Sequence, residues 1–298
     1  MPQHNDKSRL MRLATYASVL TAVTLISAKI VAWFVSDSVS ILATLIDSSL
    51  DVLASIVNMV AVHHALQPAD KEHRFGHGKA EALAGLGQSM FIAGSAGVLL
   101  LQAIHRLLHP QPLQNGIELG MVVMVFSIVM TLLLITFQNY VIARTDSSAI
   151  RADALHYRTD LLVNATVIAA LLLSLYGWQY MDSIFAILIA VYIVYSAWEI
   201  IKESIDLLMD HEISNDDRAL IQQIILSHPK SRGMHDLRTR RSGTTVFVQL
   251  HLEMDRDLTL LEAHSITEDL EQKVIALFGD AEVIIHEDPY PNSSTVLS

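Results

Sequence analysis

Paired ionisable residues inside apolar stretches constrain the fold of this chain more than any other feature of its sequence. One stretch long enough to cross a membrane carries Asp47 and Asp51, and a later one carries His156 and Asp160. The members of each pair are four residues apart, a spacing that places both side chains on one face of a helix. Charged groups at membrane depth are costly, so they usually face a cavity and bind or relay ions. The pattern therefore predicts an ion site between membrane helices.

The composition agrees with a membrane protein. Hydrophobic residues make up 52% of the 298 residues and charged residues only 17%, which is too apolar for an ordinary soluble protein. The first apolar stretch is full length and has no A-x-A-like cleavage site, so we expect a membrane helix and not a signal peptide. A spanning helix needs ~20 apolar residues. We expect an all-α bundle of six membrane helices within residues 1–208, over 12–34, 39–64, 82–106, 117–143, 149–175 and 182–206.

Three carboxylates and one imidazole can hold a divalent cation in tetrahedral geometry, which suits zinc. Asp51 and Asp160 lie near the middle of their stretches, so the two pairs can meet near the bilayer centre. The alternative is that these side chains pair with buried cations or hydroxyls elsewhere in the bundle. The chain has no cysteine, which excludes disulfides and thiolate metal sites. Lys29, near the outer end of the first stretch, is expected to extend to the interface without a ligand role.

The distribution of basic residues predicts the orientation. They gather in the N-terminal tail and in the connections after the second and fourth stretches, whereas the opposite connections carry few. The positive-inside rule therefore puts both termini in the cytoplasm. The net charge of −11 comes largely from the C-terminal part, which fits cation handling and argues against a nucleic-acid partner. The basic residues of the N-terminal tail and of these two connections are Lys7, Arg9, Arg12, Lys71, Arg74, Lys79, Arg144 and Arg151.

Residues 209–298 differ in composition and predict a small cytoplasmic α+β domain. Charged residues and turn signals replace the apolar runs. The order α-β-β-α-β suggests an open, ferredoxin-like fold that lacks its first strand. About 80 residues make a small core, so dimerisation or bound metal would help to stabilise it. The expected helices are 214–227, with Ser214 as its cap, and 259–277, which ends near Gly279; the expected strands are 235–241, 245–254 and 281–287.

This domain is rich in histidine. His251 projects from the polar face of its expected strand, so it is not a core residue. Each exposed histidine taken alone can be incidental. Several histidines and a carboxylate on adjacent elements instead favour a metal site, because imidazole and carboxylate are the ligands available. The candidate ligands are His235, His251, His264, His286 and Asp288.

The connection after the second stretch adds Asp70, His73 and His77. Their spacing would gather them on one helical turn, although Gly76 and Gly78 argue for a loop. They form either an exposed, weaker metal site or a solvated polar loop at the membrane face.

Three segments resemble the signature regions of the cation diffusion facilitator family. They are LIDSSLDVLAS (45–55), HRFGHGKAEALA (73–84) and ADALHYRTDLLVN (152–164). The resemblance covers almost the whole chain and points to the bacterial YiiP-type zinc and ferrous-iron efflux proteins. It implies a homodimeric antiporter in the inner membrane that exchanges a divalent cation for protons. Zinc is the expected cargo and metal ligand, with cadmium or ferrous iron as alternatives and no organic cofactor.

The resemblance also implies roles for individual residues. The transport ligands would be Asp47, Asp51, His156 and Asp160. A loop site would use Asp70, His73 and His77, and a cytoplasmic binuclear site would use His235, His251, His264, His286 and Asp288. Lys79 and Asp210 match an interfacial salt bridge near the membrane–cytoplasm junction, and the role of Glu287 stays open.

The expected mechanism follows from ligand chemistry. Metal binding requires neutral imidazole and ionised carboxylates, so metal and protons compete for the same atoms. Alternating access around a fixed site would then let inward proton movement drive metal export. A membrane metalloenzyme is one alternative, but no H-E-x-x-H motif is present, so we expect no enzyme. A metal sensor with a passive anchor would leave the ligands inside the bilayer unexplained.

Overall fold

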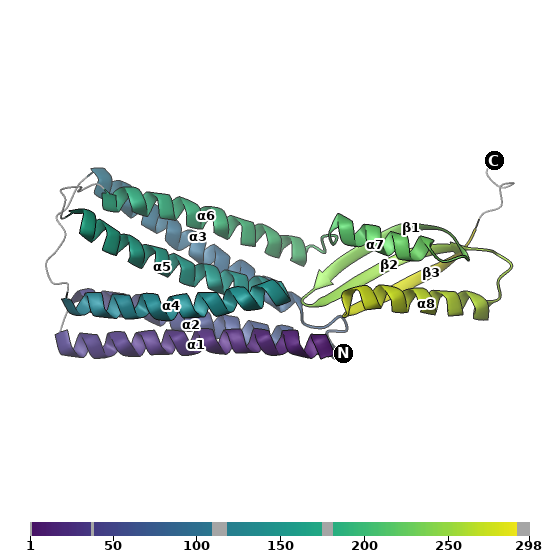
Figure 1. Ribbon diagram of the computed structural model, residues 1–298, viewed down its shortest axis with the longest axis horizontal. Helices are drawn as coiled ribbons and strands as arrows, with labels where there is room; N and C mark the ends of the chain where they lie inside the picture. The colour runs from purple at the N-terminus through teal and green to yellow at the C-terminus, as the bar shows by residue number, and fades with distance from the viewer. Residues whose placement is uncertain (1, 37–38, 109–117, 175–180, 291–298) are drawn as a thin grey trace.

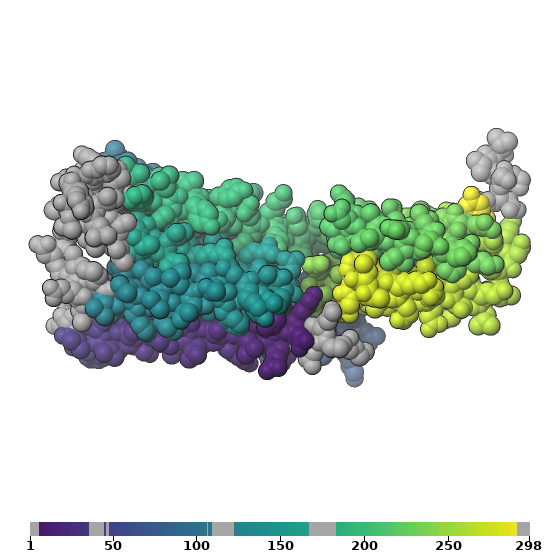
Figure 2. Space-filling view, viewed as in Figure 1, coloured from purple at the N-terminus to yellow at the C-terminus, as the bar shows by residue number. Residues whose placement is uncertain are grey.

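The computed structural model describes residues 2–36, 39–108, 118–174 and 181–290, without the side chains of some of them. Within these ranges, six long helices form one end of an elongated molecule and an α+β unit forms the other (Figure 1). The two parts meet end to end, as the space-filling view shows (Figure 2). The long helices are α1 (Pro2–Ser36), α2 (Val39–Ala65), α3 (Lys79–Leu108), α4 (Glu118–Thr145), α5 (Ser148–Ser174) and α6 (Met181–Leu208).

The long helices extend beyond the apolar stretches. α1 begins at Pro2, where the missing backbone N–H of proline costs nothing because the first turn has no acceptor for it. The helix then continues through a polar segment into the apolar stretch. Hydropathy marks the part of a helix that suits lipid, and it does not mark where helical hydrogen bonding starts.

Four of the described helices are long and apolar enough to cross a membrane. They are α1, α3, α4 and α6, with spans over Asp6–Val35, Lys79–His105, Val122–Thr145 and Ser183–Leu208. The expected six spans are thus supported for four. The other two helices, α2 and α5, have 27 residues each and carry the ionisable pairs.

The six helices pack as two groups with α5 between them (Figure 1). α3 runs along α6, whereas α1 contacts both α2 and α4. α5 contacts α3, α4 and α6 extensively and α2 only over a short length. Near the α+β unit, the buried side chains of Met11, Val62, Val141 and Ile150 join α1, α2, α4 and α5.

The α+β unit has the expected order of elements. Its sheet has the strand order β1-β2-β3, with β1 antiparallel and β3 parallel to β2. Alternate residues of β2, from Val246 to Met254, enter one core together with α7 and α8. Both helices therefore cover the same face of the sheet. The elements are α7 (Asn215–Leu226), β1 (Ser231–Ser242), β2 (Thr245–Met254), α8 (Leu260–Phe278) and β3 (Ala281–Pro289).

Local signals explain the bounds of these elements. Ser214 caps α7 by accepting a hydrogen bond from the backbone N–H of Asp217, as predicted. Thr259 and Glu262 form a capping box at the start of α8, and Gly279 ends it with φ of 75°. The first strand begins at Ser231, earlier than expected, because a register shift between residues 231 and 233 lets pairing with β2 continue.

Candidate metal centres

Three converging side chains, buried His156 with half-buried Asp51 and Asp160, join α2 and α5 near the middle of both helices. Nε2 of His156 lies 3.1 Å from Oδ1 of Asp51 and 3.9 Å from Oδ2 of Asp160. One ligand atom from each residue lies within 4.8 Å of the other two. Tetrahedral zinc needs ligand atoms about 3.3 Å apart, so small side-chain adjustments would suffice. We call these three residues the helix triad. The side chain of Asp47, one turn before Asp51 on α2, lies outside the described residues.

Neighbouring polar groups hold the helix triad in place. The hydroxyl of Tyr157, next to His156, is fully buried and donates to the backbone oxygen of Ser18 at 3.2 Å. It also lies 3.0 Å from the hydroxyl of Ser55, one turn after Asp51. These contacts tie α1, α2 and α5 together beside the triad. Because the histidine nitrogen and the carboxylate oxygens converge, the site can bind a cation or exchange protons.

The loop between α2 and α3 gathers a second group, which we call the loop cluster. His73 and His77 each place a ring nitrogen 3.4 Å from an oxygen of Asp70. Gly76 has φ of 77°, so the segment turns as a loop, as its glycines indicate. A hydrogen bond from the backbone N–H of His73 lowers the pKa of Asp70. His77 turns Nε2 toward Asp70, while its Nδ1 is buried without a hydrogen-bond partner among the described residues.

Strand register builds a third group on the sheet. His251 on β2 pairs with His235 on β1 and with His286 on β3, so three imidazoles stand side by side. Their ring centroids are 4.9 and 4.7 Å apart. Asp288 faces them, with Oδ2 2.8 Å from Nδ1 of His251, and this hydrogen bond lowers the pKa of Asp288. Ligand atoms of His235, His251 and Asp288 all lie within 4.8 Å of one another, whereas His286 is outside that group and contacts Asp288 at 3.4 Å. We call these four residues the sheet cluster. A neutral imidazole set beside a carboxylate fits a divalent metal.

Two residues near the sheet cluster lie elsewhere than the sequence suggests. His264 lies on α8, which covers the opposite face of the sheet, and it is outside the group of converging ligand atoms in the described part of the chain. Glu287 accepts a hydrogen bond from the hydroxyl of Thr267 on α8, so it too points to the helix side. By contrast, Glu253 places Oε1 3.1 Å from Nδ1 of His235 and was not among the expected ligands.

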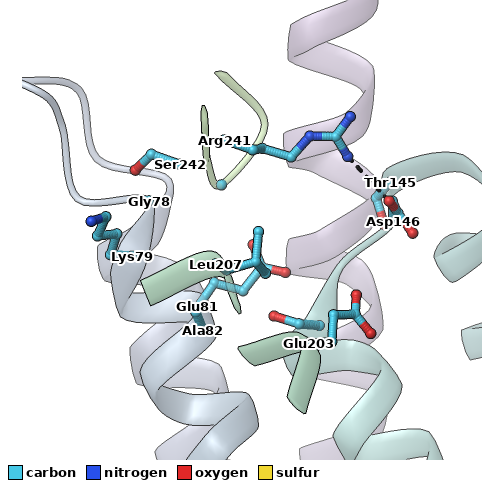
Figure 3. Close-up of a pocket in the computed structure, with 12 residues that line it drawn as sticks. Gly78, Lys79, Glu81, Ala82, Thr145, Asp146, Glu203, Leu207, Arg241 and Ser242 are labelled. Carbon is cyan, nitrogen blue, oxygen red and sulfur yellow. Dashed lines mark hydrogen bonds and ion pairs between the residues drawn. The ribbon is translucent and has the colours of Figure 1, made fainter. Parts of the chain in front are cut away.

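The helical part and the α+β unit touch closely where α3 begins (Figure 3). A Cβ on Gly78 would lie 2.5 Å from the backbone of Ser242, at the tip of the β1–β2 hairpin. In Figure 3, Arg241 of the hairpin reaches Asp146 between α4 and α5, at 3.1 Å. Asp146 also binds Arg151 of α5 at 2.7 Å. The hairpin therefore contacts both the loop before α3 and the turn before α5. We call this contact region the junction.

Further contacts at the junction surround the expected ion pair. Nζ of Lys79 lies 3.0 Å from Oδ1 of Asp210 within one chain. Partial burial opposes ionisation of Asp210, but hydrogen bonds from Lys79 and Arg240 outweigh it, so its pKa is lowered. Arg240 also stacks over Phe75 of the loop and Phe247 of β2. The loop cluster is thereby fixed to the sheet through an aromatic contact.

A buried carboxylate on α5 was not among the site residues expected from the sequence. Asp153 on α5 is buried and bound by two glutamines from other helices. A carboxylate one turn before His156 was visible in the sequence, but its partners were not.

Lys29 was expected to extend to the interface, and this was wrong. Its Nζ lies 2.5 Å from the buried hydroxyl of Ser48 on α2, because a hydroxyl within reach replaces the lost water.

Comparison with known proteins adds a family to this geometry. Residues 15–209 match the family model of the cation efflux transmembrane domain, and residues 213–290 match the model of the cytoplasmic domain of cation efflux proteins. The chain is 50% identical over 289 residues to the cation-efflux pump FieF of Shewanella oneidensis, with 97% of each chain covered. It is 48% identical over 286 residues to the cation-efflux pump FieF of Cronobacter sakazakii, covering 96% of this chain and 95% of that relative.

A solved structure is similar to about a quarter of the chain. The metal-bound C-terminal domain of the CzcD transporter from Thermotoga maritima is 26% identical, with a TM-score of 0.26. That match covers 27% of this chain and 99% of the solved chain.

Proposed function

The chain belongs to the cation efflux family, the cation diffusion facilitators, and we propose that it exports zinc from the cytoplasm in exchange for protons. The family moves cations across membranes and is not a family of enzymes. The observation that carries the proposal is the convergence of Asp51, His156 and Asp160 midway along α2 and α5. Asp47 would complete the ligand set as a fourth donor. Ionisable ligands at this depth are costly to keep unless they serve transport.

The ligand types support zinc as the cargo. One imidazole nitrogen with carboxylate oxygens favours a borderline cation, and tetrahedral geometry suits zinc. Cadmium and ferrous iron are the alternatives that the same donors would accept. The cargo binds as a substrate, so each ligand atom must release it again on the other side.

Proton exchange follows from the same donors. His156 binds metal only when its ring nitrogen is unprotonated, and Asp51 and Asp160 only when they are ionised. A site open to the cytoplasm would take up zinc, and protons arriving from outside would displace it after rearrangement. Alternating access around a fixed site near the middle of the membrane meets this requirement. The short contact between α2 and α5 favours such a rearrangement.

We further propose an orientation and a division into domains. All six long helices would cross the inner membrane, with both termini in the cytoplasm. The membrane domain would comprise residues 1–208 and the cytoplasmic domain residues 209–298. In support, basic residues gather at the end of the bundle that meets the α+β unit, as the positive-inside rule requires. Examples are Arg12 of α1, Lys79 of α3 and Arg151 of α5.

The loop cluster and the sheet cluster are proposed as resident metal sites. Zinc at the sheet cluster would bind His235, His251, His286 and Asp288, with His264 as a ligand only if a further rearrangement brings it there. The loop cluster would bind a single, more exposed ion. Both lie on segments that meet at the junction, which supports a regulatory role. Metal binding would favour one arrangement if the two states bind metal with different affinity.

We propose a homodimer as the working unit. The histidine-bearing face of the sheet is not covered by α7 or α8, and the family model matched by residues 213–290 describes the cytoplasmic domain. A small core gains stability from a second copy. The proposed salt bridge of Lys79 and Asp210 would help to set the angle at which the two domains meet. Neither nucleic acid nor an organic cofactor has a place in this function.

Zinc flux in sealed vesicles tests the proposal. The purified full-length protein is reconstituted, zinc is supplied on one side, and a proton gradient is imposed or collapsed. We expect zinc flux that depends on the gradient and a matching proton countercurrent. Zinc flux without proton movement would refute antiport, and zinc binding without flux would indicate a sensor instead.

A further inference from the structure

Asp153 is the second carboxylate on α5 besides Asp160, and it lies outside the helix triad. It is one helical turn before His156 and is only 1% exposed. Its Oδ1 accepts a hydrogen bond from Nε2 of Gln88 on α3 at 3.2 Å. Its Oδ2 accepts one from Nε2 of Gln138 on α4 at 2.7 Å. These two hydrogen bonds join α5 to α3 and to α4.

Uncharged groups donate the hydrogen bonds that the side chain of Asp153 accepts. Among the described residues its hydrogen-bond partners are Gln88, Gln138 and the hydroxyl of Ser18. His156, one turn further along α5, acts on Asp153 as a nearby charge and not through a hydrogen bond. A buried carboxylate whose hydrogen bonds come from neutral groups is expensive inside a membrane bundle. Hydrogen bonds to a charged acceptor are stronger and more directional than neutral ones, so they fix the relative positions of the helices that carry them.

Asp153 belongs to a polar layer across the bundle. Asn58 lies between Ser55 and Val62 on α2. Ser55 contacts Tyr157, one turn after Asp153, and Val62 shares a buried cluster with Ile150, one turn before it. Asn58 is therefore level with Asp153. Both amide atoms of Asn58, and Oε1 of Gln138, are buried without a partner among the described residues. The layer has hydrogen-bonding capacity left, so its partners can change when α2 and α5 move apart.

The layer sits where it can set the geometry of the helix triad. α5 is one continuous helix from Asp153 through His156 to Asp160, at about 1.5 Å of rise per residue. A shift or rotation of α5 at Asp153 therefore moves both downstream ligands relative to Asp51. Since α5 contacts α2 only briefly and packs extensively on α3, α4 and α6, these three helices contribute most to its position.

We propose that Asp153 is a positioning residue for transport, which holds α5 between α3 and α4 so that His156 and Asp160 face Asp51. The inference rests on the proposed transport site. It predicts that loss of the carboxylate weakens zinc binding at the helix triad even though every triad ligand is still present.

The test compares the variant Asp153→Asn with the control Ser127→Ala in reconstituted full-length protein. Asparagine keeps the volume but turns an N–H donor toward the donors of Gln88 or Gln138. Ser127 is also buried, but its hydroxyl donates to the backbone oxygen of Val123 in its own helix. Loss of a partner that orients metal ligands costs about 10–100-fold in affinity, so we expect KM for zinc to rise by at least about ten-fold in Asp153→Asn. The control should keep the wild-type KM.

An exchange of the two side chains separates positioning from general packing. The double variant Asp153→Asn with Gln138→Glu returns a carboxylate–amide pair between α4 and α5 with the two groups reversed. KM should recover toward the wild-type value, whereas a packing defect would lower the amount of folded protein and leave KM unrecovered. Should the exchanged protein fail to fold, Gln138→Leu removes the same hydrogen bond and should raise KM as Asp153→Asn does.

The variant Asp51→Ala tells failure of this inference from failure of the proposed function. Normal zinc flux in Asp51→Ala would overturn the transport site itself, and the role of Asp153 with it. If Asp51→Ala abolishes flux while Asp153→Asn keeps the wild-type KM, only the positioning role is overturned. An unchanged KM in Gln138→Leu would overturn it equally.

Discussion

The helix triad and the sheet cluster use the same donor types in opposite surroundings. Both combine imidazole nitrogen with aspartate oxygen, and both place these atoms close enough for one metal ion. In the helix triad, the side chain of His156 is 10% exposed, whereas that of His235 in the sheet cluster is 50% exposed. Burial makes the triad expensive to keep without its cation, and exposure makes the sheet cluster cheap to keep.

This difference decides what each group can reveal about function. A buried ionisable group in a membrane helix is informative by its presence alone. An exposed histidine is not, so the inference for the sheet cluster depends on geometry. That geometry is the pairing of His251 with His235 on one side and His286 on the other. The comparison predicts that the helix triad is essential for transport and that the sheet cluster regulates transport.

The largest expected effect is the loss of transport when the triad loses a carboxylate. Asp51→Ala or Asp160→Ala should lower zinc flux by about 100-fold or more, because the cation loses a charged ligand in surroundings that offer no water in its place. Vesicle flux of the purified variant measures this. Asp257→Ala, in an exposed turn, is the control and should transport normally. Normal flux from either triad variant would remove the basis of the comparison.

The next effect is the loss of metal-dependent stability in the cytoplasmic domain. The core of residues 213–285 is built from its own side chains, so the segment 209–298 can be measured alone. Zinc at 100 times its Kd should stabilise this segment by about 2.7 kcal/mol, and His251→Ala with Asp288→Ala should abolish that gain. Metal content and thermal unfolding give the readout.

The same double variant in the full protein should transport more slowly, with proton coupling retained. Its helix triad keeps all its ligands, so proton and zinc still compete there. Unchanged metal content and unchanged melting in the segment would show that the sheet cluster is ordinary polar surface. The regulatory proposal would fail with it.

A single added methyl group can disturb the contact between the helical part and the α+β unit at the junction. A Cβ on Gly78 would lie 2.5 Å from the backbone of Ser242, so Gly78→Ala must push the hairpin away from α3. Overpacking of this kind costs about 1–3 kcal/mol. We expect transport that responds less to cytoplasmic metal. Gly87→Ala on α3 is the control, since a Cβ there meets nothing within 4 Å. Equal metal response in the two variants would show that the junction does not couple the regions.

Sequence reasoning reached the helix triad because its ligands come from local spacing. Asp51, His156 and Asp160 stand out as ionisable residues in apolar helices, and periodicity alone assigns their faces. Alternation along β2 likewise assigned His251 to the polar face of its strand. Local patterns of this kind also explain the caps of α7 and α8.

What the sequence could not supply is contact between distant elements. The alignment of His235, His251 and His286 depends on long-range strand register. The position of His264 depends on which face α8 covers, and the helix period alone does not say. The partners of Asp153 come from α3 and α4, 65 and 15 residues away in the chain. In each case the sequence showed the chemical type of the side chain but not which distant residues would lie beside it.

Selectivity offers a finer test of the same contrast. His156 supplies the single nitrogen of the triad, so His156→Asp leaves an all-oxygen site that suits harder ions and looser geometry. We expect discrimination of zinc over manganese to fall by about ten-fold, which corresponds to about 1.4 kcal/mol. Competition between the two ions in vesicle flux measures it. An unchanged zinc preference would mean that His156 does not set selectivity, although it could still bind the ion.

The smallest expected effect concerns acid sensitivity of the metal-free cytoplasmic domain. The hydrogen bond from His251 lowers the pKa of Asp288. A carboxyl with a lower pKa in the folded state stabilises the fold above its unfolded pKa, ~3.9, and this stability is lost as the pH falls through the folded pKa. His251→Ala removes the bond, so the variant should be less stable than the wild type near neutral pH. The difference should close in acid, below the folded pKa.

Denaturant unfolding of the metal-free segment as a function of pH measures this difference. Arg232→Ala is the control, because hydrogen bonds from Arg232 lower the pKa of Asp255 outside the sheet cluster. It should show an acid dependence of the same sign but keep the full stabilisation by zinc, since none of its atoms belongs to the cluster. His251→Ala should lose both. A gap between wild type and His251→Ala that widens toward acid would contradict the assigned hydrogen bond. The hydrogen bond to Asp288 and the binding of zinc are both assigned to the imidazole of His251. If zinc still stabilised His251→Ala, the hydrogen bond would be independent of metal binding.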